Sequence, residues 1–242
     1  MIGTWFTIPH IMVAELVAQG GFDFLLLDGE HAPVPPDAIS YLLPATELYS
    51  APVIYRVRTN AVDLIRGALD AGASGVMVPM IETVTDARNA LNAAKYPPLG
   101  KRGIGPWRAS NYYENFLDYV AEANDKTCVI LQIESAAAVE AIENIASLEG
   151  IDVLYVGPAD LAATMGLTIG ASHPALTEAI ERIATVARKH RKALGIDATT
   201  IELFSRSQAM GFTFFTYSVD TTYILEGARA ASTQLRALMS RR

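Results

Sequence analysis

The chain has 242 residues, of which 51% are hydrophobic and 19% are charged, and this composition is typical of a globular protein and too apolar for a disordered one. Its 19 basic and 26 acidic side chains give a net charge of −7, and its largest basic cluster is the terminal pair Arg241 and Arg242, so no nucleic-acid partner is expected. The single cysteine, Cys128, excludes an internal disulfide framework and a metal site built from several cysteines.

No apolar run approaches the length of a membrane span, and residues 1–4 lack the charged and apolar regions of a secretion signal. We therefore expect a soluble, cytoplasmic protein that binds a small molecule and does not bind a membrane.

Short apolar runs alternate with amphipathic stretches along the whole chain. Strands are expected at residues 4–7, 24–27, 53–57, 75–78, 129–133, 153–156, 193–196 and 212–217. Helices are expected at residues 12–19, 37–48, 61–71, 84–95, 139–145, 174–190, 201–210 and 221–239. The strand runs are continuous rather than alternating, which is typical of strands buried on both faces.

Eight strand–helix units predict a parallel sheet with right-handed crossovers. In a chain of this length the expected fold is an α/β (β/α)8 barrel, a TIM barrel, that forms one domain over residues 1–242. A doubly wound open sheet is the competing architecture. It usually has a glycine-rich phosphate turn after its first strand, and residues 8–10 (Ile-Pro-His) do not form one.

Residues 96–113 form an unusually long connection that is rich in proline and glycine. Loops of this length in compact domains are often functional.

Polar side chains follow nearly every predicted strand. Because the carboxyl ends of the strands of a parallel barrel lie on one rim, we expect these side chains to converge there. So many ionisable groups in one small volume would be costly without a cation or a ligand. The polar side chains that follow the predicted strands are Asp28, Glu30, His31, Arg56, Arg58, Glu82, Gln132, Glu134, Asp160, Asp197, Tyr217 and Ser218.

Glu134 and Asp160 are the candidate metal ligands, because both offer oxygen donors at the ends of neighbouring predicted strands. Gln132 is expected on the same face as Glu134, since side chains two apart in a strand point the same way. Two carboxylates, completed by water and a chelating substrate, suit octahedral Mg²⁺ or Mn²⁺, with Co²⁺ or Zn²⁺ as further candidates. The alternative is that the two carboxylates form salt bridges with arginine, and sequence position alone does not separate these readings.

Three further side chains are candidates for handling substrate or protons. His31 suits proton transfer near neutral pH, although a loop histidine is more often inert. Arg56 at a strand end can hold a carboxylate or an enolate, or can be the counter-ion of Asp28 or Glu30. Trp5 can form an apolar wall for a small substrate or can belong to the core.

The lysines all lie away from the carboxyl ends of the predicted strands. A Schiff-base lysine would have to project from that rim. Imine chemistry is therefore disfavoured, and a metal ion or arginine must supply electrophilic activation. The lysines are Lys95, Lys101, Lys126, Lys189 and Lys192.

Several motifs resemble the HpcH/HpaI aldolase family, in the family's order and over nearly the whole chain. They are D-G-E-H-A at residues 28–32, V-P-M at 78–80, Y-P-P-L-G-K-R-G at 96–103, Q-I-E at 132–134 and G-P-A-D-L at 157–161. Each motif alone is weak, and together they are highly specific. The resemblance implies a metal-dependent class II aldolase on a (β/α)8 barrel that cleaves 4-hydroxy-2-oxo acids to pyruvate, or a related 2-oxo acid, and an aldehyde.

The resemblance also implies a role for each candidate. Glu134 and Asp160 would bind the ion, with Gln132 helping to place it or its waters. Arg56 would bind the keto oxygen, and His31 would transfer a proton. In the same way, Ala159 would offer its backbone N–H to the substrate carboxylate, Trp5 would border the donor's methyl group, and Asp28 and Glu30 would support the rim.

The family pairs its histidine with an aspartate that corresponds to Asp70. The predicted elements place Asp70 at a helix end on the opposite rim from His31, so a contact within one barrel is not expected. The resemblance implies a homo-oligomer, a trimer or hexamer, with the last helix (about 221–239) exchanged between subunits, and a neighbouring subunit would then supply Asp70.

The chain departs from the family pattern at Pro106 and Trp107, at Asp197, and at Tyr217 and Ser218. These positions are expected to shape the aldehyde or donor pocket, so the dicarboxylic semialdehyde preference of the best-known member is not carried over. One rival function is an acyl-CoA lyase of the malyl-CoA or citryl-CoA type, for which the basic residues of the long loop would have to bind phosphates. The other is a metal-binding barrel without catalysis.

Overall fold

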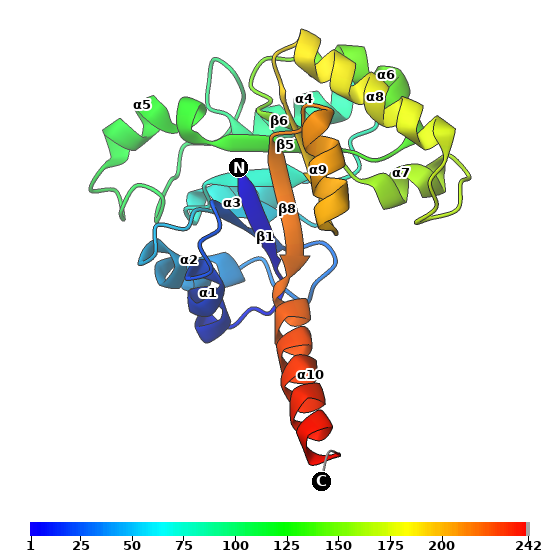
Figure 1. Ribbon diagram of the computed structural model, residues 1–242. Coiled ribbons are helices and arrows are strands. Elements are labelled where there is room, and N and C mark those ends of the chain that lie inside the picture. The colour runs from blue at the N-terminus through cyan, green and yellow to red at the C-terminus, as the bar shows by residue number, and fades with distance from the viewer. Residues whose placement is uncertain (241–242) are drawn as a thin grey trace.

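The computed structural model describes residues 1–240 (Figure 1). The terminal basic pair, Arg241 and Arg242, and with it the end of the expected 1–242 domain, lies outside the described residues.

Eight parallel strands close into a barrel in which each strand pairs with the next in the sequence and β8 pairs with β1. This confirms the expected (β/α)8 barrel, and every predicted strand is present with ends shifted by a few residues. The strands are β1 (Ile2–Phe6), β2 (Phe24–Asp28), β3 (Val53–Arg56), β4 (Gly75–Val78), β5 (Cys128–Ile133), β6 (Val153–Val156), β7 (Ala193–Asp197) and β8 (Phe214–Val219).

Helices follow the strands, and two of them were not expected from the sequence. Those two are α5 and α7, and a proline at its first position starts α7. The helices are α1 (Ile11–Ala18), α2 (Ala38–Glu47), α3 (Val62–Asp70), α4 (Val84–Ala94), α5 (Phe116–Lys126), α6 (Ala136–Ala146), α7 (Pro158–Thr164), α8 (Pro174–Lys189), α9 (Ile201–Ala209) and α10 (Asp220–Met239).

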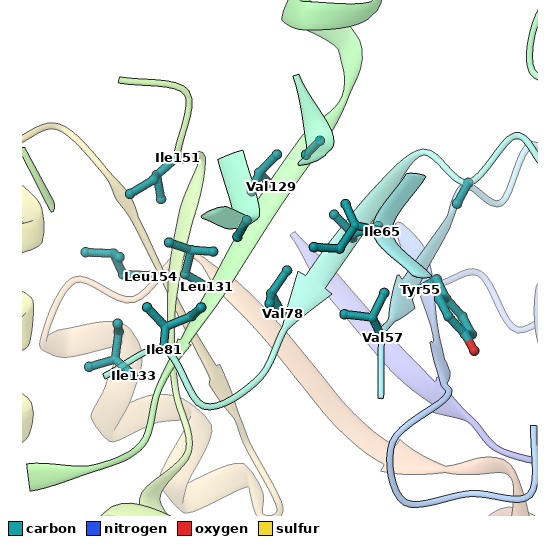
Figure 2. Close-up of a cluster of buried hydrophobic side chains, with 14 of the residues drawn as sticks. Tyr55, Val57, Ile65, Val78, Ile81, Val129, Leu131, Ile133, Ile151 and Leu154 are labelled. Atoms are coloured by element: carbon teal, nitrogen blue, oxygen red, sulfur yellow. The ribbon is translucent and has the colours of Figure 1, made fainter. Parts of the chain in front are cut away.

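The core consists of two apolar layers, one on each side of the barrel wall. The larger lies between the strands and the surrounding helices, and Figure 2 shows part of it, with Val78 and Leu131 from the strands gathered near Ile65 from α3. The smaller fills the barrel interior with side chains such as Leu26, Ile54 and others of the alternate set. Burial on both faces explains why the strand sequences are continuously apolar.

Alternation along each strand places polar residues directly above the interior layer. Asp28 lies two residues after Leu26, and Arg56 lies two residues after Ile54, so each points to the barrel axis like its apolar predecessor. The sequence thereby changes from apolar to charged at the carboxyl rim of the barrel, where the candidate site lies.

The long connection before α5 lies against the opposite, amino end of the barrel. Its Arg102 Nη2 donates to Asp70 Oδ1 at 2.6 Å, and its Arg108 pairs with Glu47 and donates to the carbonyl oxygen of Ala71. The connection therefore binds the segment that leads into β4.

Helix α10 projects away from the barrel instead of packing along it (Figure 1). Its first residue, Asp220, is buried and accepts hydrogen bonds from Thr7 and from the backbone N–H of Ile8. The rest of the helix is exposed or half-buried, including Ile224 and Leu238. Within residues 1–240, no helix combines the length and apolar character that a membrane crossing requires.

Candidate functional site

Arg56 lies within a group of carboxylates at the carboxyl rim formed by β2 and β3. Its Nε and Nη2 donate to the two carboxylate oxygens of Asp28 at 2.9 and 2.8 Å. Its Nη1 lies 3.1 Å from Glu30 Oε2. The register that pairs Asp28 with Arg56 across neighbouring strands accounts for this geometry. The proposed counter-ion role of Arg56 is therefore present in the structure, and it fixes the guanidinium at the rim.

Trp5 covers one side of this guanidinium and connects it to a second buried carboxylate. The Arg56 Cζ lies 4.3 Å from the centre of the Trp5 ring, a cation–π contact. The Trp5 indole N–H donates to Asp197 Oδ1 at 3.1 Å. Thr216 donates to the same oxygen at 2.7 Å, and Tyr155 lies 2.6 Å from the Thr216 hydroxyl.

Glu134 stands immediately after β5 and is held by its neighbours on both carboxylate oxygens. The backbone N–H of Met80 donates to Oε1 at 2.8 Å, and Gln132 Nε2 donates to Oε2 at 2.9 Å. The bond from Gln132 confirms that the two side chains share a face. Gly157 permits the close approach of β6, since a Cβ there would lie 2.7 Å from Glu134 Oε2.

Negative charge exceeds positive charge at this rim. Burial raises the pKa of Glu134, and the charges of Glu30 and Asp160 add to the rise. Burial likewise raises the pKa of Glu30 against the opposing charge of Arg56. Burial is the largest single influence on the pKa of Asp28 and acts to raise it. The hydrogen bonds and the charge of Arg56 together outweigh burial, so the pKa of Asp28 is lowered. One arginine thus compensates Asp28 and leaves the other carboxylates short of a cation.

The oxygen atoms around Glu134 fit a hard divalent cation. The Oε1 of Gln132 is buried and has no hydrogen-bond partner among residues 1–240, and an unpaired buried oxygen is stabilised by a cation or its water. Carboxylate and amide oxygens are ligands of Mg²⁺ and Mn²⁺. No group of three or more His, Cys, Asp or Glu side chains in the described chain is arranged around one point, so water and substrate would complete the coordination.

The other predicted residues lie as follows. His31 is exposed, with its Nε2 3.7 Å from Glu30 Oε2. Ala159 and Asp160 occupy the first turn of α7 after β6, where backbone N–H groups have no acceptor within the helix. Asp70 ends α3 at the amino end of the barrel and pairs with Arg102. The structure therefore places the predicted site residues at the carboxyl rim, with the exception of Asp70, which lies at the opposite end.

Two contributors were not identified as site residues from the sequence. The backbone N–H of Met80 follows from a left-handed conformation at that residue, with φ of 53°, and no residue type indicates it. Asp197 was expected at the rim but without a specific role, because its partners Trp5 and Thr216 come from strands that are distant in sequence. An aspartate at the end of an otherwise apolar strand was the available signal.

The comparisons with known proteins agree with one another. The sequence profile of the HpcH/HpaI aldolase/citrate lyase family matches residues 2–226. The chain is 38% identical over 237 residues to a 4-hydroxy-2-oxo-heptane-1,7-dioate aldolase from Salmonella arizonae, which covers 98% of this chain and 90% of that protein.

Two solved structures are similar over almost their whole length. One is an HpcH/HpaI aldolase/citrate lyase family protein from Burkholderia cenocepacia, with a TM-score of 0.90, 34% identity, and coverage of 98% of this chain and 94% of that one. The other is a citrate synthase, SbnG, with a TM-score of 0.88, 28% identity, and coverage of 99% and 94%.

Proposed function

The chain belongs to the HpcH/HpaI aldolase/citrate lyase family, and from this premise we propose that it is a divalent-metal-dependent class II aldolase. It would reversibly cleave 4-hydroxy-2-oxo acids to pyruvate, or a related 2-oxo acid, and an aldehyde. The observation that carries the proposal is the excess of carboxylates over cations around Glu134, together with the unpaired Oε1 of Gln132.

Glu134 and Asp160 would hold the ion, and Gln132 would orient it or its waters. When bound, the ion would draw electron density from the keto group of the substrate and stabilise the negative charge that develops there. Met80 would keep Glu134 in place through its backbone N–H.

Arg56 would donate to the keto oxygen on which charge builds up as the C3–C4 bond breaks. Its pairing with Asp28 and Glu30 orients the guanidinium before substrate arrives, so little reorganisation is needed. The backbone N–H of Ala159 would bind the substrate carboxylate, because the first turn of a helix favours an anion. Trp5 would border the methyl group of the donor.

His31 would accept the proton of the 4-hydroxyl group. The electrons of that O–H bond form the aldehyde carbonyl, and the electrons of the C3–C4 bond pass to the enolate, which is then protonated at C3. The exposed imidazole has access to solvent for this exchange. Asp70 of a neighbouring subunit would orient it.

Helix α10 would pack on a neighbouring subunit in a trimer or hexamer. Its apolar side chains, such as Ile224 and Leu238, are exposed here, and an apolar cavity of about 340 Å³ lies between α1 and the start of α10. Exchange of a terminal helix between identical subunits would cover both surfaces. Ile224→Asp should then give a smaller species in light scattering, and an unchanged mass would contradict the exchange.

Deuterium exchange tests the proposed reaction without knowledge of the aldehyde. In D₂O with Mg²⁺ or Mn²⁺ the protein should exchange the methyl protons of pyruvate, as followed by proton NMR, and EDTA should stop the exchange. His31→Ala should slow it by about 10²–10⁴, the range of acid–base assistance. Undiminished exchange after confirmed metal loss would contradict metal dependence. No exchange at all would favour a barrel without catalysis.

The structure weakens the argument for an acyl-CoA substrate. The basic residues of the long loop that were candidates for binding its phosphates lie at the amino end of the barrel, where Arg102 pairs with Asp70 and Arg108 with Glu47. The similarity to a citrate synthase keeps this substrate class in the test. Parallel assays with a 4-hydroxy-2-oxo acid and with malyl-CoA or citryl-CoA separate the two.

A further inference from the structure

Asp197 is a half-buried carboxylate that the proposed reaction does not use. It ends β7, points to the barrel axis and is half-buried at the same rim as Arg56. A carboxylate at such a position is costly unless it is paired or binds a ligand. Arg56 already pairs with Asp28 and Glu30, so Asp197 has no cation of its own there.

The hydrogen bonds on Asp197 leave one of its oxygens open. Trp5 Nε1 and Thr216 Oγ1 both donate to Oδ1, at 3.1 and 2.7 Å. The Thr216 hydroxyl is itself held by Tyr155, so the orientation of the carboxylate is fixed. Within residues 1–240 the carboxylate accepts these two hydrogen bonds and no others. Its Oδ2 is therefore available to a ligand.

Asp197 lies at the same rim as the residues that would bind the donor. Asp197 and Ala159 line one cavity of about 510 Å³ that also reaches α8 and α9. Trp5 connects Asp197 to Arg56, since its ring covers the guanidinium and its N–H binds Oδ1. If the keto oxygen binds Arg56 and the carboxylate binds Ala159, the C3 carbon of the donor would lie toward Trp5 and Asp197.

We propose that Asp197 determines the donor, and that it selects a 2-oxo acid with a hydroxyl group on C3. The hydroxyl would donate to Oδ2, and a bare methyl group would leave that oxygen without a partner. A site built to bind a hydroxyl group discriminates strongly against a substrate that lacks it. This inference rests on the proposed aldolase function and names the donor class that the same site prefers.

The test compares two donors in one protein. The kcat/KM for C3 proton exchange in D₂O with Mn²⁺ is measured for hydroxypyruvate and for pyruvate, after subtraction of the exchange without protein. The unaltered chain should favour hydroxypyruvate. Asp197→Leu should lower the ratio of the two values by roughly 10- to 100-fold, as expected for a lost hydrogen bond to a charged group. Glu202→Gln, an exposed carboxylate on α9, should leave the ratio unchanged.

Asp197→Asn keeps an oxygen for Trp5 and Thr216, so it serves if the leucine variant does not fold. Its amide lacks the charge, and the ratio should fall by a smaller factor. A preference for pyruvate in the unaltered chain would overturn the inference, and so would an unchanged ratio in a folded variant, which would leave Asp197 as a support for Trp5. If neither donor exchanges in the unaltered chain, the aldolase function fails instead.

Discussion

Two arginine–aspartate pairs, one at each end of the barrel, differ in their balance of hydrogen-bond donors and acceptors. At the carboxyl rim, Arg56 makes two hydrogen bonds to Asp28 and a further contact with Glu30. At the amino end, Arg102 makes one short hydrogen bond to Asp70 and stacks over Tyr96, while its Nε and Nη1 are buried without partners in the described chain. The first site has too many acceptors, and the second has too many donors.

The difference separates a binding site from a structural contact. Burial raises the pKa of Glu134 and of Glu30, neighbouring carboxylates add to each rise, and a bound cation would relieve both. Arg102 instead has a fully buried side chain, and its role is to hold the long connection against the end of α3. An arginine–aspartate pair therefore indicates a binding site or a structural contact only when the charges around it are considered as well.

The largest effect on activity is expected when the negative charge of Glu134 is removed. Glu134→Gln should lower the rate of pyruvate proton exchange by roughly 10³ or more, because the loss of metal assistance is worth several kcal/mol. The measurement is the exchange rate as a function of Mn²⁺ concentration. Glu140→Gln on the exposed face of α6 is the matched control and should match the unaltered chain. An E134Q variant with normal metal dependence would remove Glu134 from the metal site.

A somewhat smaller effect is expected when Arg56 is replaced. Arg56→Ala should lower kcat for exchange by about 10²–10³, the range for one lost oxyanion donor. Arg56→Lys should recover little, because an ammonium cannot reproduce the two-pronged contact with Asp28. Turnover within a few-fold of normal in R56A would show that the residue is only the counter-ion of Asp28.

The sequence predicted the barrel because its strands are continuously apolar and end in polar residues. It also predicted that Gln132 and Glu134 share a face, since that follows from strand alternation alone. The short helix α7 was missed because it contains only seven residues, Pro158–Thr164, too few for a visible helical period. The contact of Met80 with Glu134 could not be predicted, because it depends on backbone geometry between two separate loops.

The pair at the amino end should affect stability more than chemistry within a subunit. Asp70→Ala leaves the buried guanidinium of Arg102 without an anion and should lower the free energy of unfolding by about 2–3 kcal/mol. Urea unfolding at fixed protein concentration measures this. The double variant D70A/R102M removes both charges and should be less destabilised than the sum of the single changes. Strict additivity would show that the two side chains do not stabilise each other.

The smallest expected effect is a dependence of stability on pH that arises at the carboxyl rim. Because burial raises the pKa of Glu134, the folded chain binds that proton more tightly than the unfolded chain. The resulting stability is fully present below the ordinary pKa of glutamate and is lost as pH rises through the folded value. Asp28, whose pKa is lowered, contributes in the opposite sense and loses its contribution only as pH falls below the ordinary range of aspartate.

Urea unfolding of the EDTA-treated protein across this pH range should therefore show a decline in stability above the ordinary glutamate pKa. Its size should be about 1.4 kcal/mol for each unit by which the folded and unfolded pKa differ. Glu134→Gln should reduce the decline, and saturating Mn²⁺ should offset it, since the ion binds the charged carboxylate. A decline that persists unchanged in E134Q would assign it to other carboxylates, Glu30 or Asp197 at the rim or Asp70 at the amino end, whose pKa values burial also raises.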